Sequence, residues 1–200
     1  YHSQSVEAYF AHVPGLLVVT PAFPCDAAGL LRSALRAEDP VLFLEHKFTY
    51  NAIRGEVPDD DYLVPIGKAE VKRPGKNLSV FTYGLMLHYS LKAAEELAKD
   101  GVEAEVVDLR TLLPLDKEAI LASARKTGKV LIVHEDTKTG GLGAEVAAII
   151  AEEGFEYLDA PICRVTGPDV PAMPYAPTLA EAFMPNPDKI LHAMRELAKY

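Results

Sequence analysis

The chain of 200 residues can form one large domain or two small ones, and its 49% hydrophobic and 24% charged residues are typical of a globular protein. A net charge of −9 argues against a nucleic-acid binder or a protein that binds anionic membranes, because both need a basic surface. No uninterrupted apolar run of about 18 residues occurs, so we expect no membrane span. The two cysteines, Cys25 and Cys163, match no metal spacing and favour a reducing cytoplasm.

The first part of the chain alternates between helical and strand patterns. The predicted order is helix, strand, helix, strand, at residues 6–13, 16–20, 27–38 and 41–46. Ser3 or Ser5 is suited to cap the first helix. Because a sheet of two strands is marginal, we expect this part to complete an α/β domain that begins before Tyr1.

Residues 47–66 lose all periodicity and contain two prolines, a glycine and the aspartate run at 59–61. This composition predicts a surface linker. The aspartates suggest either a solvated charge run or, less simply, ligands for a hard cation. Residues 69–77 then predict an edge strand and a turn.

The second part of the chain predicts a parallel sheet with helices on both faces, because strands alternate with single helices. Strands are expected at residues 78–84, 102–109, 129–135 and 163–167. Helices are expected at residues 88–101, 115–128, 144–154 and 188–199, with a rigid proline-rich loop at 168–178. Asp116 and Gly128 are suited to begin and end the second of these helices.

Three features could carry chemistry. His134, Glu135 and Asp136 follow an apolar strand, where a histidine beside carboxylates could act as a general base or simply mark a polar strand end. The glycine-rich run at residues 140–143 could receive an anion or form a tight turn, but it lacks a nucleotide-binding fingerprint. His2 could be structural, or a neutral ring at a helix N-terminus that is competent in acid–base chemistry.

Several stretches together resemble one family, the beta subunit of the decarboxylating component of 2-oxo acid dehydrogenase complexes. They are YHSQS at residues 1–5, PIGKAEV at 65–71, AEVVDLRTLLPLD at 104–116 and LDAPICRVTGPDVP at 158–171. The resemblance implies an α/β fold in three parts. These are the end of a pyrimidine-binding domain, a linker, and a transketolase-type C-terminal domain with three layers and a mostly parallel sheet, at residues 1–46, 47–66 and 67–200.

The resemblance also implies an enzyme that uses thiamine diphosphate and magnesium. Two alpha and two beta subunits would decarboxylate a 2-oxo acid and pass the acyl group to a lipoyl group on a transacylase core. Residues 43–50 look closest to bacterial branched-chain 2-oxoisovalerate dehydrogenases, which act in branched-chain amino acid degradation, although pyruvate and acetoin enzymes share many of these residues. The location would be the cytoplasm, or the mitochondrial matrix in a eukaryote.

The same resemblance assigns roles to particular residues. His2 would assist reductive acylation as a proton donor or orienting group. A potassium site is implied at a helix end, with three backbone carbonyls and one carboxylate from Ala34, Leu35, Ala37 and Asp39. Asp159 and Tyr200 would contact the peripheral-subunit-binding domain of the transacylase.

The groups that hold the diphosphate and activate the cofactor belong to the alpha subunit or to sequence upstream of Tyr1. We therefore expect this stretch to be inactive alone. A different class of function also fits the same residues, since the chain could act only as a non-catalytic module for assembly and docking.

Overall fold

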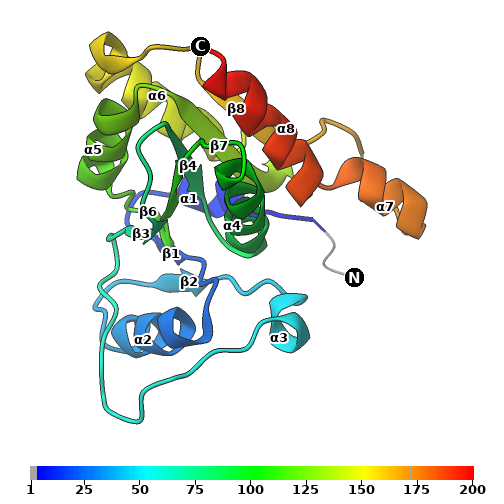
Figure 1. The fold of residues 1–200 in the computed structure, drawn as a ribbon. Coiled ribbons are helices and arrows are strands. Elements are labelled where there is room, and N and C mark those ends of the chain that lie inside the picture. The colour runs from blue at the N-terminus through cyan, green and yellow to red at the C-terminus, as the bar shows by residue number, and fades with distance from the viewer. Residues whose placement is uncertain (1–3, 172) are drawn as a thin grey trace.

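The computed structural model describes residues 4–171 and 173–200, and its centre is a five-stranded sheet (Figure 1). The strand order is β3-β5-β4-β7-β8. The strands are β3 (Glu70–Arg73), β4 (Leu78–Thr82), β5 (Ala104–Asp108), β7 (Val130–Thr137) and β8 (Cys163–Gly167). All pairs are parallel except β3 with β5, which is antiparallel. The predicted mostly parallel sheet and its edge strand are therefore confirmed.

Helices cover both faces of this sheet and give three layers (Figure 1). One face packs against α4 (Leu85–Ala98) and α8 (Pro187–Ala198), and the other against α5 (Lys117–Thr127) and α6 (Gly143–Glu153). Successive residues of a strand point to opposite faces. Val80 accordingly joins one hydrophobic core and its neighbour Phe81 joins the other, and both are fully buried.

The ends of these helices follow from local chemistry. The Asp116 carboxylate accepts a hydrogen bond from the backbone N–H of Ala119, and Gly128 takes the left-handed conformation with φ of 67°. Both predictions for α5 are confirmed. In contrast, α4 begins at Leu85 rather than residue 88, directly after Gly84 with φ of 56°.

The first part of the chain forms a smaller sheet that takes one strand from the second part. The predicted elements appear in order as α1 (Glu7–Ala11), β1 (Leu17–Val19), α2 (Pro24–Leu35) and β2 (Val41–Phe43). An unpredicted strand, β6 (Thr111–Leu113), pairs antiparallel with β1 in the order β2-β1-β6. The capping prediction for Ser5 is wrong, because α1 starts after Val6 without a side-chain cap. Ser3 lies outside the described residues.

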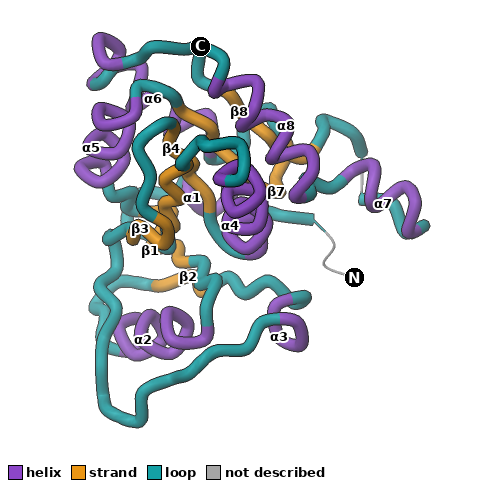
Figure 2. Tube along the Cα trace, viewed as in Figure 1, coloured by secondary structure: helices purple, strands orange, loops and turns teal. Residues whose placement is uncertain are grey.

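Residues 47–66 are mostly irregular, as predicted, but they include the short helix α3 (Thr49–Ala52). Figure 2 shows the long loop from α3 to β3 running past α2. The Tyr62 hydroxyl donates to the carbonyl of Cys25 at 2.7 Å, which holds the loop against α2. Asp61 lies at 2.7 Å from Arg36 with an exposed side chain, which confirms the solvated charge run for that residue.

Near the C-terminus, the short 3-10 helix η1 (Phe155–Tyr157) precedes β8, and α7 (Pro177–Phe183) begins inside the predicted proline-rich loop. Pro177 lies in the first turn of α7, where proline is tolerated because its missing N–H would have no helical partner. Among the described residues, no helix has both the length and the apolar character needed to cross a membrane.

Candidate active site

A cleft of about 710 Å³ lies between the first and second parts of the chain. Its walls come from the N-terminal segment, from the loop after β2, from the β4–α4 turn and from the end of β7. β4 and β7 are parallel neighbours, so the cleft lies at the carboxyl edge of the sheet, where ligands of open α/β sheets usually bind. Gln4 and Ser5, which follow the predicted active-site histidine in sequence, line this cleft.

One wall of the cleft carries a buried acid–phenol pair. The Tyr83 hydroxyl donates a hydrogen bond of 2.7 Å to the carboxylate of Glu7, and the two residues are 7% and 5% exposed. Burial raises the pKa of Glu7, and the charges of Asp136 and Glu135 raise it further. Burial also raises the pKa of Tyr83 well above its usual value, so the phenol remains a hydrogen-bond donor.

A histidine–carboxylate pair also lines the cleft. His46 Nε2 lies 2.9 Å from Glu135 Oε2, and the backbone N–H of Phe48 donates to His46 Nδ1 at 3.2 Å. Because Nδ1 accepts a hydrogen bond, the neutral ring carries its proton on Nε2 and donates it to Glu135. Both ring nitrogens are therefore engaged by other groups of the chain, and both residues of the pair line the cleft.

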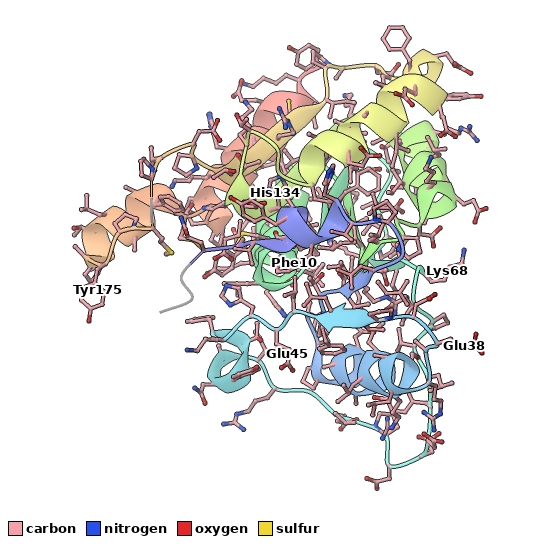
Figure 3. The ribbon with its side chains drawn as sticks, turned by 180° about the vertical axis from the view of Figure 1, so that it is seen from behind. Phe10, Glu38, Glu45, Lys68, His134 and Tyr175 are labelled. Atoms are coloured by element: carbon pink, nitrogen blue, oxygen red, sulfur yellow. The ribbon has the colours of Figure 1, made fainter. Side chains whose placement is uncertain are left out.

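The prediction that His134 could act as a general base is wrong, whereas the predicted polar strand end applies to the next residues, Glu135 and Asp136, which are partly exposed. The His134 side chain is fully buried, and burial lowers the pKa of His134 to about 4, so the ring is neutral at pH 7. The His134 ring, labelled in Figure 3, stacks on Tyr83 with 6.2 Å between ring centroids, and Tyr83 lines the cleft whereas His134 does not. Neither ring nitrogen has a hydrogen-bond partner among the described residues.

The glycine-rich run at residues 140–143 forms the predicted strand-to-helix turn, and the reason is the His134 ring. A Cβ atom on Gly143 would lie 2.5 Å from His134 Nε2, and one on Gly141 would lie 2.7 Å from His134 Cε1. The run therefore lets the chain pack around a buried imidazole. The sequence pattern does not reveal this role, because it depends on tertiary contact between the turn and the ring.

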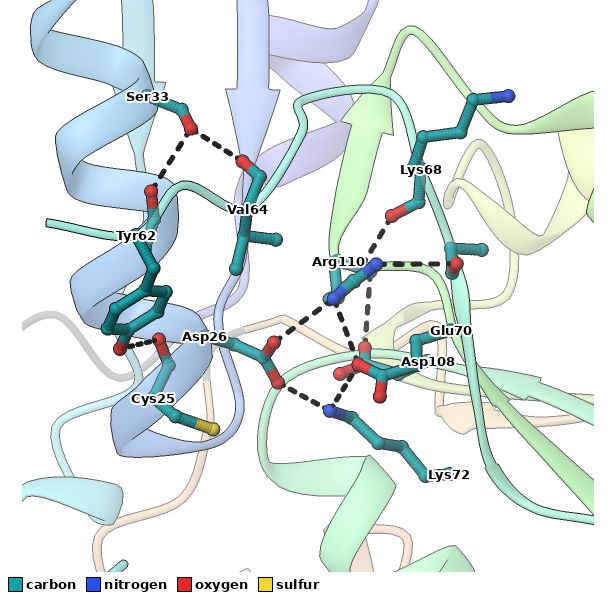
Figure 4. Close-up of polar contacts among 12 residues, drawn as sticks. Cys25, Asp26, Ser33, Tyr62, Val64, Lys68, Glu70, Lys72, Asp108 and Arg110 are labelled. Atoms are coloured by element: carbon teal, nitrogen blue, oxygen red, sulfur yellow. Dashed lines mark hydrogen bonds and ion pairs between the residues drawn. The ribbon is translucent and has the colours of Figure 1, made fainter. Parts of the chain in front are cut away.

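A cluster of charges, here called the clamp, joins α2 to the second part of the chain (Figure 4), and it is largely buried except at Glu70, whose side chain is 43% exposed. It consists of Asp26, Glu70, Lys72 and Arg110. Lys72 Nζ lies 2.6 Å from Asp26 and 2.5 Å from Glu70, while Arg110 Nη1 lies 3.1 Å from Asp26 and 2.9 Å from Glu70. The sequence analysis did not predict the clamp. A signal for it was Arg110, a charged residue directly after the apolar strand that was expected at residues 102–109.

The residues of the predicted potassium site lie close together at the C-terminal end of α2. Helix carbonyls there lack helical partners, and the helix dipole favours a cation, so the setting suits the ion. The Ala34 carbonyl already accepts a hydrogen bond from the Ala37 N–H at 3.2 Å, which leaves Leu35, Ala37 and Asp39 as the freer donors of oxygen. His2 lies outside the described residues.

The two residues predicted to dock the transacylase flank one turn. Asp159 is exposed, and its N–H donates to the Gly128 carbonyl at 2.7 Å. Lys129, the next residue of this turn, donates from Nζ to the Ala198 carbonyl at 3.2 Å. Tyr200 follows shortly after and is 67% exposed. The structure therefore brings the chain end and Asp159 to the same part of the surface.

Comparisons with known proteins agree with this architecture. Residues 67–190 match the transketolase C-terminal domain family, and residues 1–52 match the transketolase pyrimidine-binding domain family. The chain is 64% identical over 200 residues to the 2-oxoisovalerate dehydrogenase subunit beta of Bacillus subtilis. The alignment covers 100% of this chain and 61% of that protein. It is 46% identical over 199 residues to the pyruvate dehydrogenase E1 component subunit beta of the same organism, again with 100% and 61% coverage.

A solved structure of a split-gene transketolase, described as an inactive beta4 tetramer, superposes with a TM-score of 0.79 and 28% identity. The match covers 96% of this chain and 60% of that one. The chain thus spans about three fifths of the relatives it matches. Its central sheet, its helical layers and both domain matches lead to one conclusion: the chain belongs to the transketolase C-terminal domain family, with transketolase pyrimidine-binding sequence ahead of that domain.

Proposed function

We propose that the chain is part of the beta subunit of a branched-chain 2-oxo acid dehydrogenase. The observation that carries this proposal is the identity of 64% along all 200 residues to the 2-oxoisovalerate dehydrogenase subunit, against 46% to the pyruvate dehydrogenase subunit. The reaction is oxidative decarboxylation of a branched-chain 2-oxo acid and transfer of the acyl group to a lipoyl-bearing transacylase. The family matches support the division of the chain into residues 1–46, 47–66 and 67–200.

The cofactor in this proposal is thiamine diphosphate with magnesium, held jointly with the alpha subunit. When bound, it supplies the nucleophilic carbon that attacks the 2-oxo group. The contribution of this chain is the cleft wall and His2, which we assign as the proton donor or orienting group for acyl transfer. Support comes from Gln4 and Ser5, which follow His2 closely in sequence and line the cleft. Potassium bound at the C-terminal end of α2 would stabilise that helix end and would not take part in the reaction.

The proposed partners are an alpha subunit, in an alpha2beta2 assembly, and the transacylase core. Support for the first is the apolar surface of α1, since Tyr9 and Phe10 are 78% and 38% exposed on one short helix and Val13, just beyond its end, is 48% exposed (Figure 3). Support for the second is the shared surface of Asp159 and Tyr200. We also propose that the protein is located in the cytoplasm, or in the mitochondrial matrix if it comes from a eukaryote.

The test uses the full-length subunit reconstituted with its alpha partner. We expect turnover of 2-oxoisovalerate to exceed that of pyruvate, and we expect His2→Ala to lose lipoyl acylation while the assembly remains intact. Equal turnover of the two acids would instead favour a pyruvate or acetoin subunit. Unchanged acylation in His2→Ala would remove the catalytic role of His2.

A non-catalytic assembly module is the second candidate, favoured by the surface that Asp159 and Tyr200 share. Isothermal titration with the peripheral-subunit-binding domain tests docking directly. Asp159→Lys should weaken binding by about tenfold or more, because it places a positive charge against a basic partner surface. Glu118→Lys, at an exposed residue of α5, serves as the matched control and should bind as the unmodified subunit does.

A further inference from the structure

The start of α1 is tied to the second part of the chain through one buried side chain. Glu7 is the first residue of α1 and is only 5% exposed, whereas Tyr9, in the same short helix, is 78% exposed. The Glu7 carboxylate accepts the hydrogen bond of 2.7 Å from the Tyr83 hydroxyl. Among the described residues, no other hydrogen bond joins residues 4–13 to any part of the chain beyond residue 16. The pair of Glu7 and Tyr83 is therefore the polar anchor of this segment.

The Tyr83 side of this anchor is held firmly from several directions. Tyr83 directly follows β4 in the central sheet, and its ring packs in one of the two hydrophobic cores. The ring also stacks on His134 with 10° between the two planes. The His134 ring in turn lies against Gly141 and Gly143, where a Cβ atom would collide with it. The phenol is thus held by β4, by β7 and by the turn before α6, so its hydroxyl is a fixed point for Glu7.

The segment in front of this anchor is the one that carries His2. Gln4, Ser5 and Val6 line the cleft, and His2 precedes Glu7 by five positions. No side chain caps the start of α1, so its first turn gains no support from the segment itself. A displacement of about 1 Å at a group that takes part in a reaction can lower the rate by about a hundredfold. Fixing Glu7 therefore matters, because it limits the positions open to the residues before it.

We propose that Glu7 and Tyr83 form a positioning pair for the N-terminal segment, and that the pair serves acyl transfer more than decarboxylation. The inference rests on the proposed function, because that proposal gives His2 its role in acyl transfer. Transfer to the lipoyl group forms a carbon–sulfur bond and breaks the sulfur–sulfur bond. The substrate carbon is oxidised by two electrons, which reduce the disulfide. Its hydroxyl group releases a proton, and the second sulfur takes one up from His2 and becomes a thiol.

The first test separates acyl transfer from decarboxylation in the reconstituted full-length assembly. Decarboxylation of 2-oxoisovalerate is measured with 2,6-dichlorophenolindophenol as the electron acceptor. Acyl transfer is measured by mass spectrometry of the lipoyl groups on the transacylase. We expect Tyr83→Phe to lower the ratio of acyl transfer to decarboxylation by about tenfold, because it removes the hydroxyl that fixes Glu7. A general loss of folded protein would lower both rates together and leave the ratio unchanged.

Two further variants show whether the hydrogen bond itself is responsible. Glu7→Gln is the conservative variant, because the amide oxygen can still accept the hydrogen bond from Tyr83, and it should retain the ratio that Tyr83→Phe loses. A fall in Glu7→Gln as large as in Tyr83→Phe would overturn the positioning role, because the carboxyl group itself would then be needed. Tyr62→Phe is the matched control and should leave the ratio unchanged. It removes a hydrogen bond of the same length, 2.7 Å to the Cys25 carbonyl, in the loop against α2.

Hydrogen exchange gives a second readout, which needs no turnover. The peptide that contains α1 should exchange about tenfold faster in Tyr83→Phe than in the unmodified assembly, because its anchor is lost, whereas Tyr62→Phe should leave that exchange unchanged. An unchanged ratio or unchanged exchange in Tyr83→Phe would overturn the proposal. If that variant does not assemble, Glu7→Ala decides by the same two measurements, since it removes the other half of the anchor. Absence of acyl transfer by the unmodified assembly would refute the proposed function instead, whatever the variants do.

Discussion

Replacement of Asp108 by asparagine should stabilise the fold at alkaline pH and do so less as the pH falls. Asp108 is fully buried at the end of β5, beside the clamp. The clamp already balances two acids, Asp26 and Glu70, with two bases, Lys72 and Arg110, so Asp108 adds an unmatched negative charge. Burial, followed by the charge of Asp26, raises the pKa of Asp108 to about 7, although Lys72 and Arg110 pull it down.

The size and direction of the effect follow from linkage. Between the ordinary pKa of 3.8 and about 7, folded Asp108 holds a proton that the unfolded chain has released. Stability from this group is therefore fully present below the lower value, falls as the pH rises, and is gone above about 7. The whole difference corresponds to about 4 kcal/mol, of which about 3 kcal/mol is lost between about pH 5 and pH 8.5.

Asparagine cannot ionise, so the Asp108→Asn variant does not lose this stability as the pH rises. Its free energy of unfolding minus that of the unmodified protein should therefore increase by about 3 kcal/mol from about pH 5 to pH 8.5. The asparagine side-chain oxygen can still accept the hydrogen bond that the Arg110 N–H donates to Asp108 at 3.1 Å. Urea unfolding at the two pH values measures the change. Asp100→Asn, at an exposed residue 2.8 Å from Arg195, is the control and should show little pH dependence. The reasoning fails if the difference for Asp108→Asn is the same at both pH values.

Further substitutions test the packing around the cleft. Gly143→Ala should destabilise the fold by about 1–3 kcal/mol, because the new methyl group collides with the His134 ring; urea unfolding checks this, and stabilisation by alanine would contradict it. Tyr83→Phe should cost about 1–3 kcal/mol by leaving Glu7 buried without its donor, and the loss seen in thermal melts should be larger at pH 8 than at pH 5, where Glu7 is more readily protonated. Lys72→Met should lower the free energy of unfolding by about 3–5 kcal/mol, because it leaves the acids of the clamp with one base fewer. A loss under about 1 kcal/mol in urea unfolding would show that the clamp contributes little to stability.

The parts of the fold that the sequence predicted are those with local signals. Alternating strands and helices between residues 78 and 154 gave the central sheet, and Asp116 and Gly128 marked the ends of α5 by side-chain and backbone chemistry. The strand β6 was missed because it has only three residues and follows Arg110, which reverses the chain with φ of 54° without being a glycine. Its pairing with β1 depends on residues nearly a hundred positions apart, which periodicity cannot reveal.

The candidate site was harder to predict, because burial decides the behaviour of its groups. His134 and Glu135 are neighbours in one strand, yet successive residues of a strand face opposite directions. His134 therefore enters the core, whereas Glu135 reaches the cleft and meets His46 from the other part of the chain. The strand pattern at residues 129–135 predicted the position of both residues, but it could not show which of them would keep contact with a ligand.

The shape of the cleft is set by contacts between residues far apart in the sequence. The two parts of the chain are joined by the β1–β6 ladder, by the clamp and by the pair of His46 and Glu135, which lie 89 positions apart. Thr20 directly follows β1, and the next helix, α2, carries the Asp26 of the clamp. The clamp therefore fixes the wall that holds Thr20, and the β7 end fixes the wall that holds Glu135. Because each wall is anchored in a buried core, the positions of Thr20 and Glu135 are set by the fold itself, which lowers the ordering cost of binding any ligand in the cleft.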